Sequence, residues 1–264
     1  MNSSSSRTFS VSEHVAAART ALQFLTIFPV GSLGLQDKKV TGLSLLYYPA
    51  VGLLVGFALA VFAWLAQSVL SIYSLELLLL AALALTVWVG LTGALHLDGL
   101  ADCADAWLGG MGSSQRTLAI MKDPTSGPIA VTVLVLLLLV KFVTLAALLA
   151  KASLWLLLVA PFVARLAVLA LLLTTPYIRP QGLGEVLSQH FPRQEAKLVL
   201  AVAVVTYLLL DFTRALPILL VSVAVLLGLR AMMLSRLRGC TGDTMGATVE
   251  ILEAVCLVVL VVVL

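Results

Sequence analysis

The sequence predicts an all-α polytopic membrane protein, and three observations carry this prediction. First, 61% of the 264 residues are hydrophobic and only 11% are charged, whereas an average soluble domain has about 25% charged residues. Second, the mean hydropathy is +1.13, and apolar runs of about 18 residues or more, each long enough to cross the hydrocarbon core as a helix, recur along the chain. Third, the runs are continuous, and the alternating pattern of a transmembrane barrel is missing.

About seven transmembrane helices are expected, preceded by a short N-terminal helix that lies at the interface or re-enters the membrane. This first helix, at residues 12–28, is short and mixed in composition. No internal repeat is visible, so residues 1–264 are expected to form a single integral membrane catalytic domain. The expected spans cover residues 45–70, 75–97, 129–150, 152–173, 197–213, 216–234 and 249–264.

Lys and Arg are distributed unevenly between the two sides that this topology creates. With the N-terminus inside, the outer turns contain only Lys151 and Arg214. Positive charge accumulates on the cytoplasmic side of membrane proteins, so the long polar loops are expected to face the cytoplasm. The Lys and Arg are dispersed and the net charge is only +3, so no nucleic-acid partner is expected. The lipid bilayer is one partner, and a homo-oligomer is left open.

The segment LHLDGLADCADAWLGG, at residues 95–110, is the most unusual part of the sequence. Asp98, Asp102 and Asp105 are spaced i, i+4 and i+7, so a helix places all three on one face. Carboxylates this close repel one another unless a cation lies among them. Oxygen ligands favour Mg²⁺, which commonly binds one or two carboxylates together with substrate phosphates. We therefore expect a metal site for a diphosphate compound here, with a solvated helix end as the alternative.

Three further segments are candidates for binding phosphate. In RTLAIMKDPTSGP, Lys122 is a candidate phosphate ligand, and Asp123 is a candidate metal ligand or base. In RGCTGDTMGATVEILE, Gly242 and Asp243 precede an expected helix, and a glycine-rich turn at a helix N-terminus can bind an anion. A tight turn with an Asp cap is the alternative there. The third segment, TTPYIRPQGLG, contains Arg179.

Two basic residues, Lys141 and Arg165, lie inside expected spans. Charge within the bilayer is costly and usually faces a partner or a wet cavity. Because the two spans are adjacent and antiparallel, we expect both side chains to point into one pocket, with Arg165 the better candidate for binding phosphate. Snorkelling along the helix is the alternative for Lys141. His96, two residues before Asp98, is expected to be structural.

These segments resemble the cobalamin synthase family, the adenosylcobinamide-GDP ribazoletransferases. ALHLDGLADCADAWLGG followed by RTLAIMKDPTSGPIA is similar to the family signature, and the resemblance covers nearly the whole chain in order. DPTSGP departs from a DSRIGA-like run, so no role is assigned to a basic residue just after Asp123. The other matching segments are ALQFLTIFPV, YYPAVGLLVG, LVKF, APFVARLAVL, RPQGLG and RGCTGDTMGATVEILE.

The resemblance implies the last assembly step of vitamin B12, at the cytoplasmic face of a bacterial inner membrane. α-Ribazole, or its 5′-phosphate, attacks the diphosphate of adenosylcobinamide-GDP, and GMP leaves. The implied cofactor is Mg²⁺. Together with the residue patterns, this makes Asp98, Asp102 and Asp105 the expected metal ligands and catalytic residues, with Asp243 as a further catalytic residue. The expected substrate-binding residues are Lys122, Asp123, Lys141, Arg165, Arg179 and Gly242.

Parts of the sequence also resemble proteins with two other functions. The segment at Asp98 begins like the DGxxA motif of the CDP-alcohol phosphotransferases, but Asp102 stands where that motif has Arg, and the later GxxxDxxxD is missing. An ion-coupled transporter also uses acids within the membrane, usually near the midplane of repeated halves. Here the acids lie at the end of an expected span, and no repeat is visible.

Overall fold

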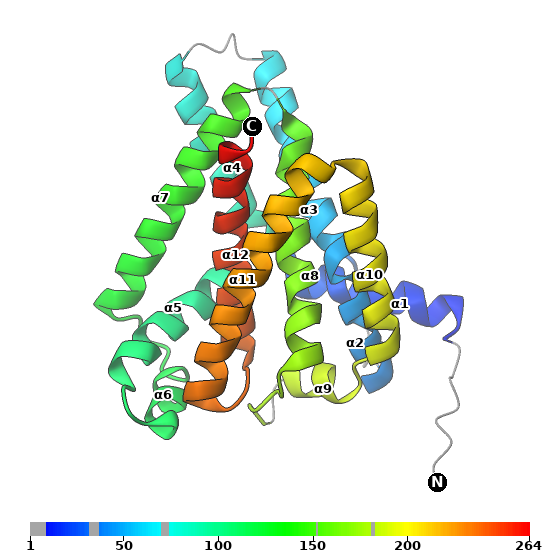
Figure 1. The fold of residues 1–264 in the computed structure, drawn as a ribbon, viewed down its shortest axis with the longest axis vertical. Helices are drawn as coiled ribbons and strands as arrows, with labels where there is room; N and C mark the ends of the chain where they lie inside the picture. The colour runs from blue at the N-terminus through cyan, green and yellow to red at the C-terminus, as the bar shows by residue number, and fades with distance from the viewer. Residues whose placement is uncertain (1–8, 32–36, 70–73, 152, 181–182) are drawn as a thin grey trace.

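The computed structural model describes residues 9–31, 37–69, 74–151, 153–180 and 183–264 as a packed group of helices (Figure 1). The helices are α1 (Val11–Leu25), α2 (Lys38–Leu43), the 3₁₀ helix η1 (Ser44–Tyr47), α3 (Tyr48–Val69), α4 (Ser74–Leu91), α5 (Leu95–Gly109), α6 (Ser114–Ile120), α7 (Pro128–Ala150), the 3₁₀ helix η2 (Leu154–Leu158), α8 (Val159–Thr174), α9 (Leu183–Gln189), α10 (Arg193–Leu210), α11 (Phe212–Leu237) and α12 (Gly242–Val262).

The helix lengths confirm a polytopic membrane protein but reduce the number of spans. Within the described residues, five stretches are long and apolar enough to cross a membrane, and α4 with α5 would form a sixth if they are one broken span. The expected count of about seven becomes five or six. The helix expected as a span at residues 197–213 is not among them, because α10 has 18 residues and begins with the charged sequence RQEAK. The five stretches are residues 38–68, 128–150, 154–174, 212–237 and 242–262.

A sharp bend replaces the straight span expected at residues 75–97. α4 ends at Leu91, and α5 leaves at an angle of 88°. Gly93 and Ala94 both have positive φ, at 60° and 55°, a conformation that costs a non-glycine residue energy and cannot continue a right-handed helix. The backbone N–H of Ile27 donates to the Leu91 carbonyl at 2.9 Å, so the segment after α1 supports the bend. The hydropathy is continuous across it, which is why the sequence pattern did not predict the bend.

The polar connections gather at one end of the long helices. Figure 1 shows α2, α6, α9 and the turn between α11 and α12 at the lower end, while α7 and α12 finish at the upper end. The helix expected at residues 12–28 is α1, which begins with a capping box between Ser10 and Glu13 and runs across the long helices (Figure 1). The site described below lies toward the lower end, where α12 begins.

α8 is the central helix, with most of its residues buried between α3 and α12. α3 approaches it closely through two glycines. A Cβ atom on Gly52 would lie 2.4 Å from the carbonyl oxygen of Pro161, and one on Gly56 would lie 2.4 Å from the Cα atom of Leu158. Small residues at such contacts let helices pack tightly in a membrane, where dispersion replaces the hydrophobic effect as the driving force.

Four charged side chains form a buried ion-pair network between α7, α8 and α12. Lys141 Nζ lies 2.6 Å from a Glu250 oxygen and 2.5 Å from a Glu253 oxygen. The second oxygen of Glu253 accepts from Arg165, which is fully buried. Lys141 also lies 4.8 Å from the centre of the Trp88 ring. Two positive and two negative charges balance, which makes their burial in the membrane tolerable.

This network indicates a structural role for Lys141 and Arg165, in place of the phosphate binding that was expected. The two basic residues do meet, as expected from their antiparallel helices, but they meet on Glu253 and Glu250. Neither basic residue lines a cavity described below. Their charges are already compensated, so we no longer assign them to phosphate binding and instead assign them to holding α7, α8 and α12 together.

Replacing Glu253 with alanine is expected to destabilise the protein by about 3–5 kcal/mol, because Lys141 and Arg165 would remain buried after losing their shared partner. The measurement is the thermal unfolding midpoint of detergent-solubilised protein. Glu195→Ala, which removes an exposed acid of α10, is the matched control and is expected to change stability by less than about 0.5 kcal/mol. Equal midpoints for the two variants would contradict the structural role of the network.

Candidate active site

The site is formed where α5 crosses the first turns of α12. A Cβ atom on Gly99 would lie 2.8 Å from the carbonyl oxygen of Asp243, and one on Gly246 would lie 3.3 Å from the Cα atom of His96. Glycine is therefore required at Gly99 for the backbones to approach this closely. The crossing brings Asp98 of α5 and Asp243 of α12, which are far apart in the sequence, to the same cavity.

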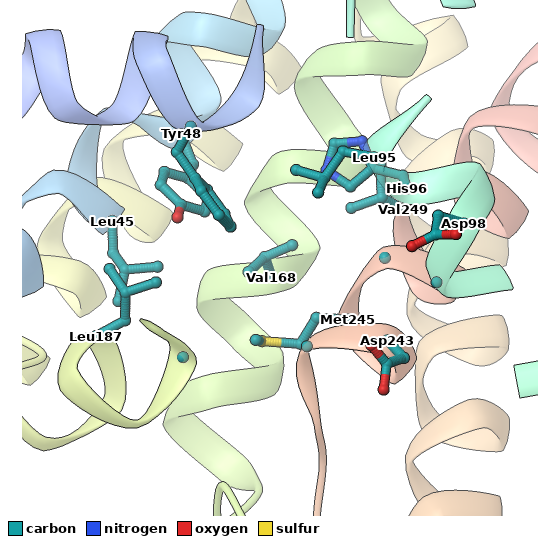
Figure 2. Close-up of a pocket in the computed structure, with 15 residues that line it drawn as sticks. Leu45, Tyr48, Leu95, His96, Asp98, Val168, Leu187, Asp243, Met245 and Val249 are labelled. Carbon is teal, nitrogen blue, oxygen red and sulfur yellow. The ribbon is translucent and has the colours of Figure 1, made fainter. Parts of the chain in front are cut away.

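The cavity has a volume of about 160 Å³ and is acidic at one side and apolar at the other. Figure 2 shows Asp98 and Asp243 on one side of it, with Leu45, Tyr48 and Leu187 on the opposite side. The other lining residues are Phe24, Leu95, His96, Gly99, Val168, Gly184, Gly242, Met245, Gly246 and Val249.

Asp243 is held by an ion pair with Arg179, whose guanidinium Nη1 lies 2.6 Å from the carboxylate. A parallel bridge between Tyr177 and Cys240 aligns the two chain segments. In it, Cys240 N–H donates to the Pro176 carbonyl at 2.8 Å, and Ile178 N–H donates to the Cys240 carbonyl at 3.0 Å. The pairing places the segment before α9 against the start of α12, and so fixes the guanidinium beside the carboxylate.

A second, smaller cavity of about 60 Å³ adjoins the first through Asp243. Lys122 and Arg179, two of the expected phosphate ligands, both line it. The carboxylate of Asp243 therefore stands between a cavity with two cationic side chains and the cavity that contains Asp98. This combination of acids and bases suits a ligand that carries a diphosphate.

The N-terminus of α12 adds a positive end to the same place. α12 begins at Gly242, after Thr241, which accepts a hydrogen bond from the Thr244 N–H in a capping box. Gly242 lines the larger cavity, and outside its own chain neighbours no described residue lies within 4 Å of where its Cβ would be. The expected tight turn is therefore present, and its open side and the helix dipole favour an anion.

The three aspartates of α5 do not act as one group. Asp105 is used to cap α7: its Oδ1 accepts from the Ala130 N–H at 3.0 Å, and its Oδ2 accepts from the Gly127 N–H. A Cβ atom on Gly127 would lie 2.8 Å from the carboxylate, so glycine is needed there. In the part of the chain that the structure describes, no group of three His, Cys, Asp or Glu is arranged to hold a metal ion. The metal-binding role expected for Asp98, Asp102 and Asp105 therefore stays a prediction.

A family model described as cobalamin-5-phosphate synthase matches residues 17–261. The chain belongs to this family. Three similar proteins are named adenosylcobinamide-GDP ribazoletransferase. That of Stutzerimonas stutzeri strain A1501 is 52% identical over 238 residues, which cover 90% of this chain and 94% of the relative. That of Pseudomonas fluorescens strain Pf-5 is 50% identical over 237 residues (90% and 95%). That of Pseudomonas syringae strain B728a is 49% identical over 241 residues (91% and 96%). No solved structure matches the chain.

Within this synthase-family chain, Asp123 lies away from the cavities. It is exposed in the loop between α6 and α7, and its carboxylate accepts from the Thr125 hydroxyl at 2.6 Å and from the Thr125 N–H at 3.0 Å. These hydrogen bonds hold the pKa of Asp123 below its usual value, which makes it a weak base. Asp123 is therefore not part of the site. From the expected set, the structure brings together Asp98, Asp243, Arg179, Lys122 and Gly242.

Sequence reasoning missed the apolar side of the site. Tyr48 and Val168 were treated as parts of membrane spans, and His96 was expected to be structural. All three line the cavity. The only signal for Tyr48 was its place in YYPAVGLLVG, a segment that resembles the synthase family. A tyrosine within an apolar helix is otherwise indistinguishable from a core residue.

The capping role of Asp105 can be separated from metal binding by measuring stability in excess EDTA. Asp105→Ala is expected to lower the free energy of unfolding by about 1–2 kcal/mol, because two N–H groups at the start of α7 lose their acceptor. Asp105→Asn, which keeps one acceptor oxygen, should fall between this variant and the unmodified protein. An alanine variant as stable as the unmodified protein without metal would contradict the cap.

Proposed function

We propose that this chain transfers the cobinamide-phosphate group of adenosylcobinamide-GDP to α-ribazole or its 5′-phosphate, with release of GMP. This reaction completes the assembly of cobalamin. The observation that carries the proposal is the full-length similarity, 49–52% identity over about nine-tenths of the chain, to ribazoletransferases. The paired acids and neighbouring bases at the α5–α12 crossing support it, because the substrate contains a diphosphate.

The reaction requires one bond to form and one to break. The ribazole hydroxyl oxygen attacks the phosphorus attached to cobinamide, the bond from that phosphorus to the bridging oxygen breaks, and GMP leaves with the bridging oxygen. The hydroxyl proton passes to a base. Asp98 and Asp243 are the carboxylates on the cavity, and we assign the base to one of them. Arg179 and Lys122, on the smaller cavity, would bind phosphate oxygens and offset the charge that develops on the leaving group.

The remaining acids fit Mg²⁺ in the manner expected for a diphosphate enzyme. Mg²⁺ commonly binds through one or two carboxylates and completes its shell with water and substrate phosphates. Asp98 and Asp102, one turn apart on α5, are the two acids of the segment that are not used as a helix cap. Bound there, Mg²⁺ would supply charge neutralisation at the diphosphate. Asp98 and Asp102 would hold the ion, and Asp105 would keep α7 in place.

We further propose that the site faces the cytoplasm. The loops that contain Lys122 and Arg179, and the last turn of α11 with Arg236, lie on the side that the excess of Lys and Arg marks as cytoplasmic. The elements that carry these loops share one end of the molecule (Figure 1). A cytoplasmic site gives direct access to the nucleotide-activated substrate.

Neutralising either cavity acid is expected to reduce turnover without unfolding the protein. Asp98→Asn and Asp243→Asn should each lower kcat for GMP release by at least about a hundredfold, as expected when an electrostatic or proton-transfer group is lost. The measurement is GMP release from adenosylcobinamide-GDP and α-ribazole by detergent-solubilised protein, with the unfolding midpoint recorded alongside. Glu195→Gln is the matched control. Full activity in both aspartate variants would overturn the assignment of the site.

Removal of divalent metal is expected to stop the reaction. GMP release should fall to background in EDTA and return when Mg²⁺ is added in excess, because the diphosphate charge would otherwise be uncompensated. Asp98→Asn should need a higher Mg²⁺ concentration for half-maximal rate wherever residual activity permits the measurement. Metal-independent release of GMP that still requires α-ribazole would leave the transferase function in place and contradict the role of Mg²⁺.

A further inference from the structure

The apolar side of the larger cavity contains a buried polar atom with no role in the fold. The Tyr48 hydroxyl, at the start of α3, is buried and has no hydrogen-bond partner among the described residues. Tyr48 is only 4% exposed and lines the cavity. His96 lines the same cavity, and its Nδ1 atom is also buried without a hydrogen-bond partner among the described residues. Buried polar groups are normally paired, so two orphan atoms on residues that line one cavity favour a ligand that completes them.

A bound water is a poor explanation for the Tyr48 hydroxyl. A buried water typically needs two to four polar partners, but this part of the cavity is lined by hydrocarbon and aromatic side chains. Phe24 is stacked beside Tyr48, with ring centres 6.3 Å apart and planes inclined by 27°. The remaining neighbours in this part are Leu45, Val168 and Leu187 (Figure 2).

We call the apolar side of the cavity, formed by Phe24, Leu45, Tyr48, Val168 and Leu187, the chamber. Its size and lining suit an aromatic ring system. An engineered cavity of about 150 Å³ lined by apolar side chains binds benzene, and the whole cavity here, with its acidic side included, has a volume of about 160 Å³. The chamber is continuous with the acidic side, where Asp98 and Asp243 lie. A ligand that fills it would therefore have a flat apolar end and a polar end that reaches the carboxylates.

Accepting the proposed function, we infer that this chamber binds the benzimidazole ring of α-ribazole and that the Tyr48 hydroxyl donates a hydrogen bond to its unsubstituted ring nitrogen. α-Ribazole has one acceptor nitrogen and two methyl groups on its ring, and its ribose would extend past His96 toward Asp98 (Figure 2). The attacking hydroxyl then reaches the acidic side, where the diphosphate is bound. Tyr48 is a specificity residue for the acceptor substrate.

The guanine of the donor substrate fits the chamber poorly. Guanine carries several donors and acceptors along its edges, and most would stay unpaired against Leu45, Val168 and Leu187. The corrin ring is too large for a cavity of about 160 Å³. The dimethylated benzimidazole fits better than the other aromatic groups of the two substrates. Its one acceptor nitrogen matches the one hydroxyl of the chamber, that of Tyr48.

Tyr48→Phe is the direct test, because it removes the hydroxyl and keeps the ring. Equilibrium binding of α-ribazole to the purified protein is expected to weaken about tenfold, the effect of one lost hydrogen bond. In GMP-release kinetics the KM for α-ribazole should rise by a similar factor, with the KM for adenosylcobinamide-GDP and kcat unchanged. An indole analogue, in which CH replaces the ring nitrogen, should bind both proteins equally weakly.

Tyr207→Phe is the matched control. Tyr207 is also buried, and its hydroxyl has no hydrogen-bond partner in the described part of the chain, but it lines a separate apolar groove between α3, α8 and α10. Its variant should bind α-ribazole normally. Val168→Phe, which fills the chamber from α8, should abolish α-ribazole binding while binding of adenosylcobinamide-GDP persists.

The possible failures of the two proposals are distinguishable. Unmodified protein that binds α-ribazole but releases no GMP would overturn the proposed function and leave the chamber assignment intact. A Tyr48→Phe variant that binds α-ribazole as tightly as the unmodified protein, or one whose defect appears in the KM for adenosylcobinamide-GDP, would overturn the chamber assignment while the function stands. Equal defects in Tyr48→Phe and Tyr207→Phe would also overturn it.

Discussion

The close crossing of α5 over the start of α12 is the contact on which the site depends. Gly99 places the α5 backbone against the backbone of Asp243, at a distance that no side chain permits. α5 leaves α4 at 88°, and this turn brings it against α12. Asp98 and the N-terminus of α12 thereby share one cavity. A larger residue at Gly99 would separate the backbones, and with them the acids.

The charged residues of the membrane domain divide into two groups with different physical roles. Lys141, Arg165, Glu250 and Glu253 are buried and mutually neutralised, so they fix the helices and carry no net charge into the bilayer. Around the cavities, by contrast, Asp98 has no ion-pair partner among the residues that the structure describes, and the ion pair of Asp243 with Arg179 is partly exposed. The first group stabilises the fold, and we propose that the second group interacts with a ligand that carries phosphates.

The features of the site that a local sequence pattern encodes were predictable. The spacing of Asp98, Asp102 and Asp105 does place them on one helix, and a glycine-rich turn does begin α12 at Gly242. What the spacing could not reveal was the hydrogen-bond partner of each acid. The N–H groups of Gly127 and Ala130 take both oxygens of Asp105, and they come from a different helix. Sequence periodicity describes one helix at a time and cannot identify such a partner.

By itself, the sequence determined the helical membrane architecture, the family and the segments that we propose carry the chemistry, because hydropathy and motif spacing are properties of contiguous residues. Only the tertiary structure decided that α4 and α5 are bent apart, that Arg165 and Lys141 pair with glutamates, and that Tyr48 lies on a chamber beside Asp98 and Asp243. The physical reason is common to all three. Each depends on a contact or backbone conformation that is set when distant segments pack together, and such contacts leave no periodic trace in the chain.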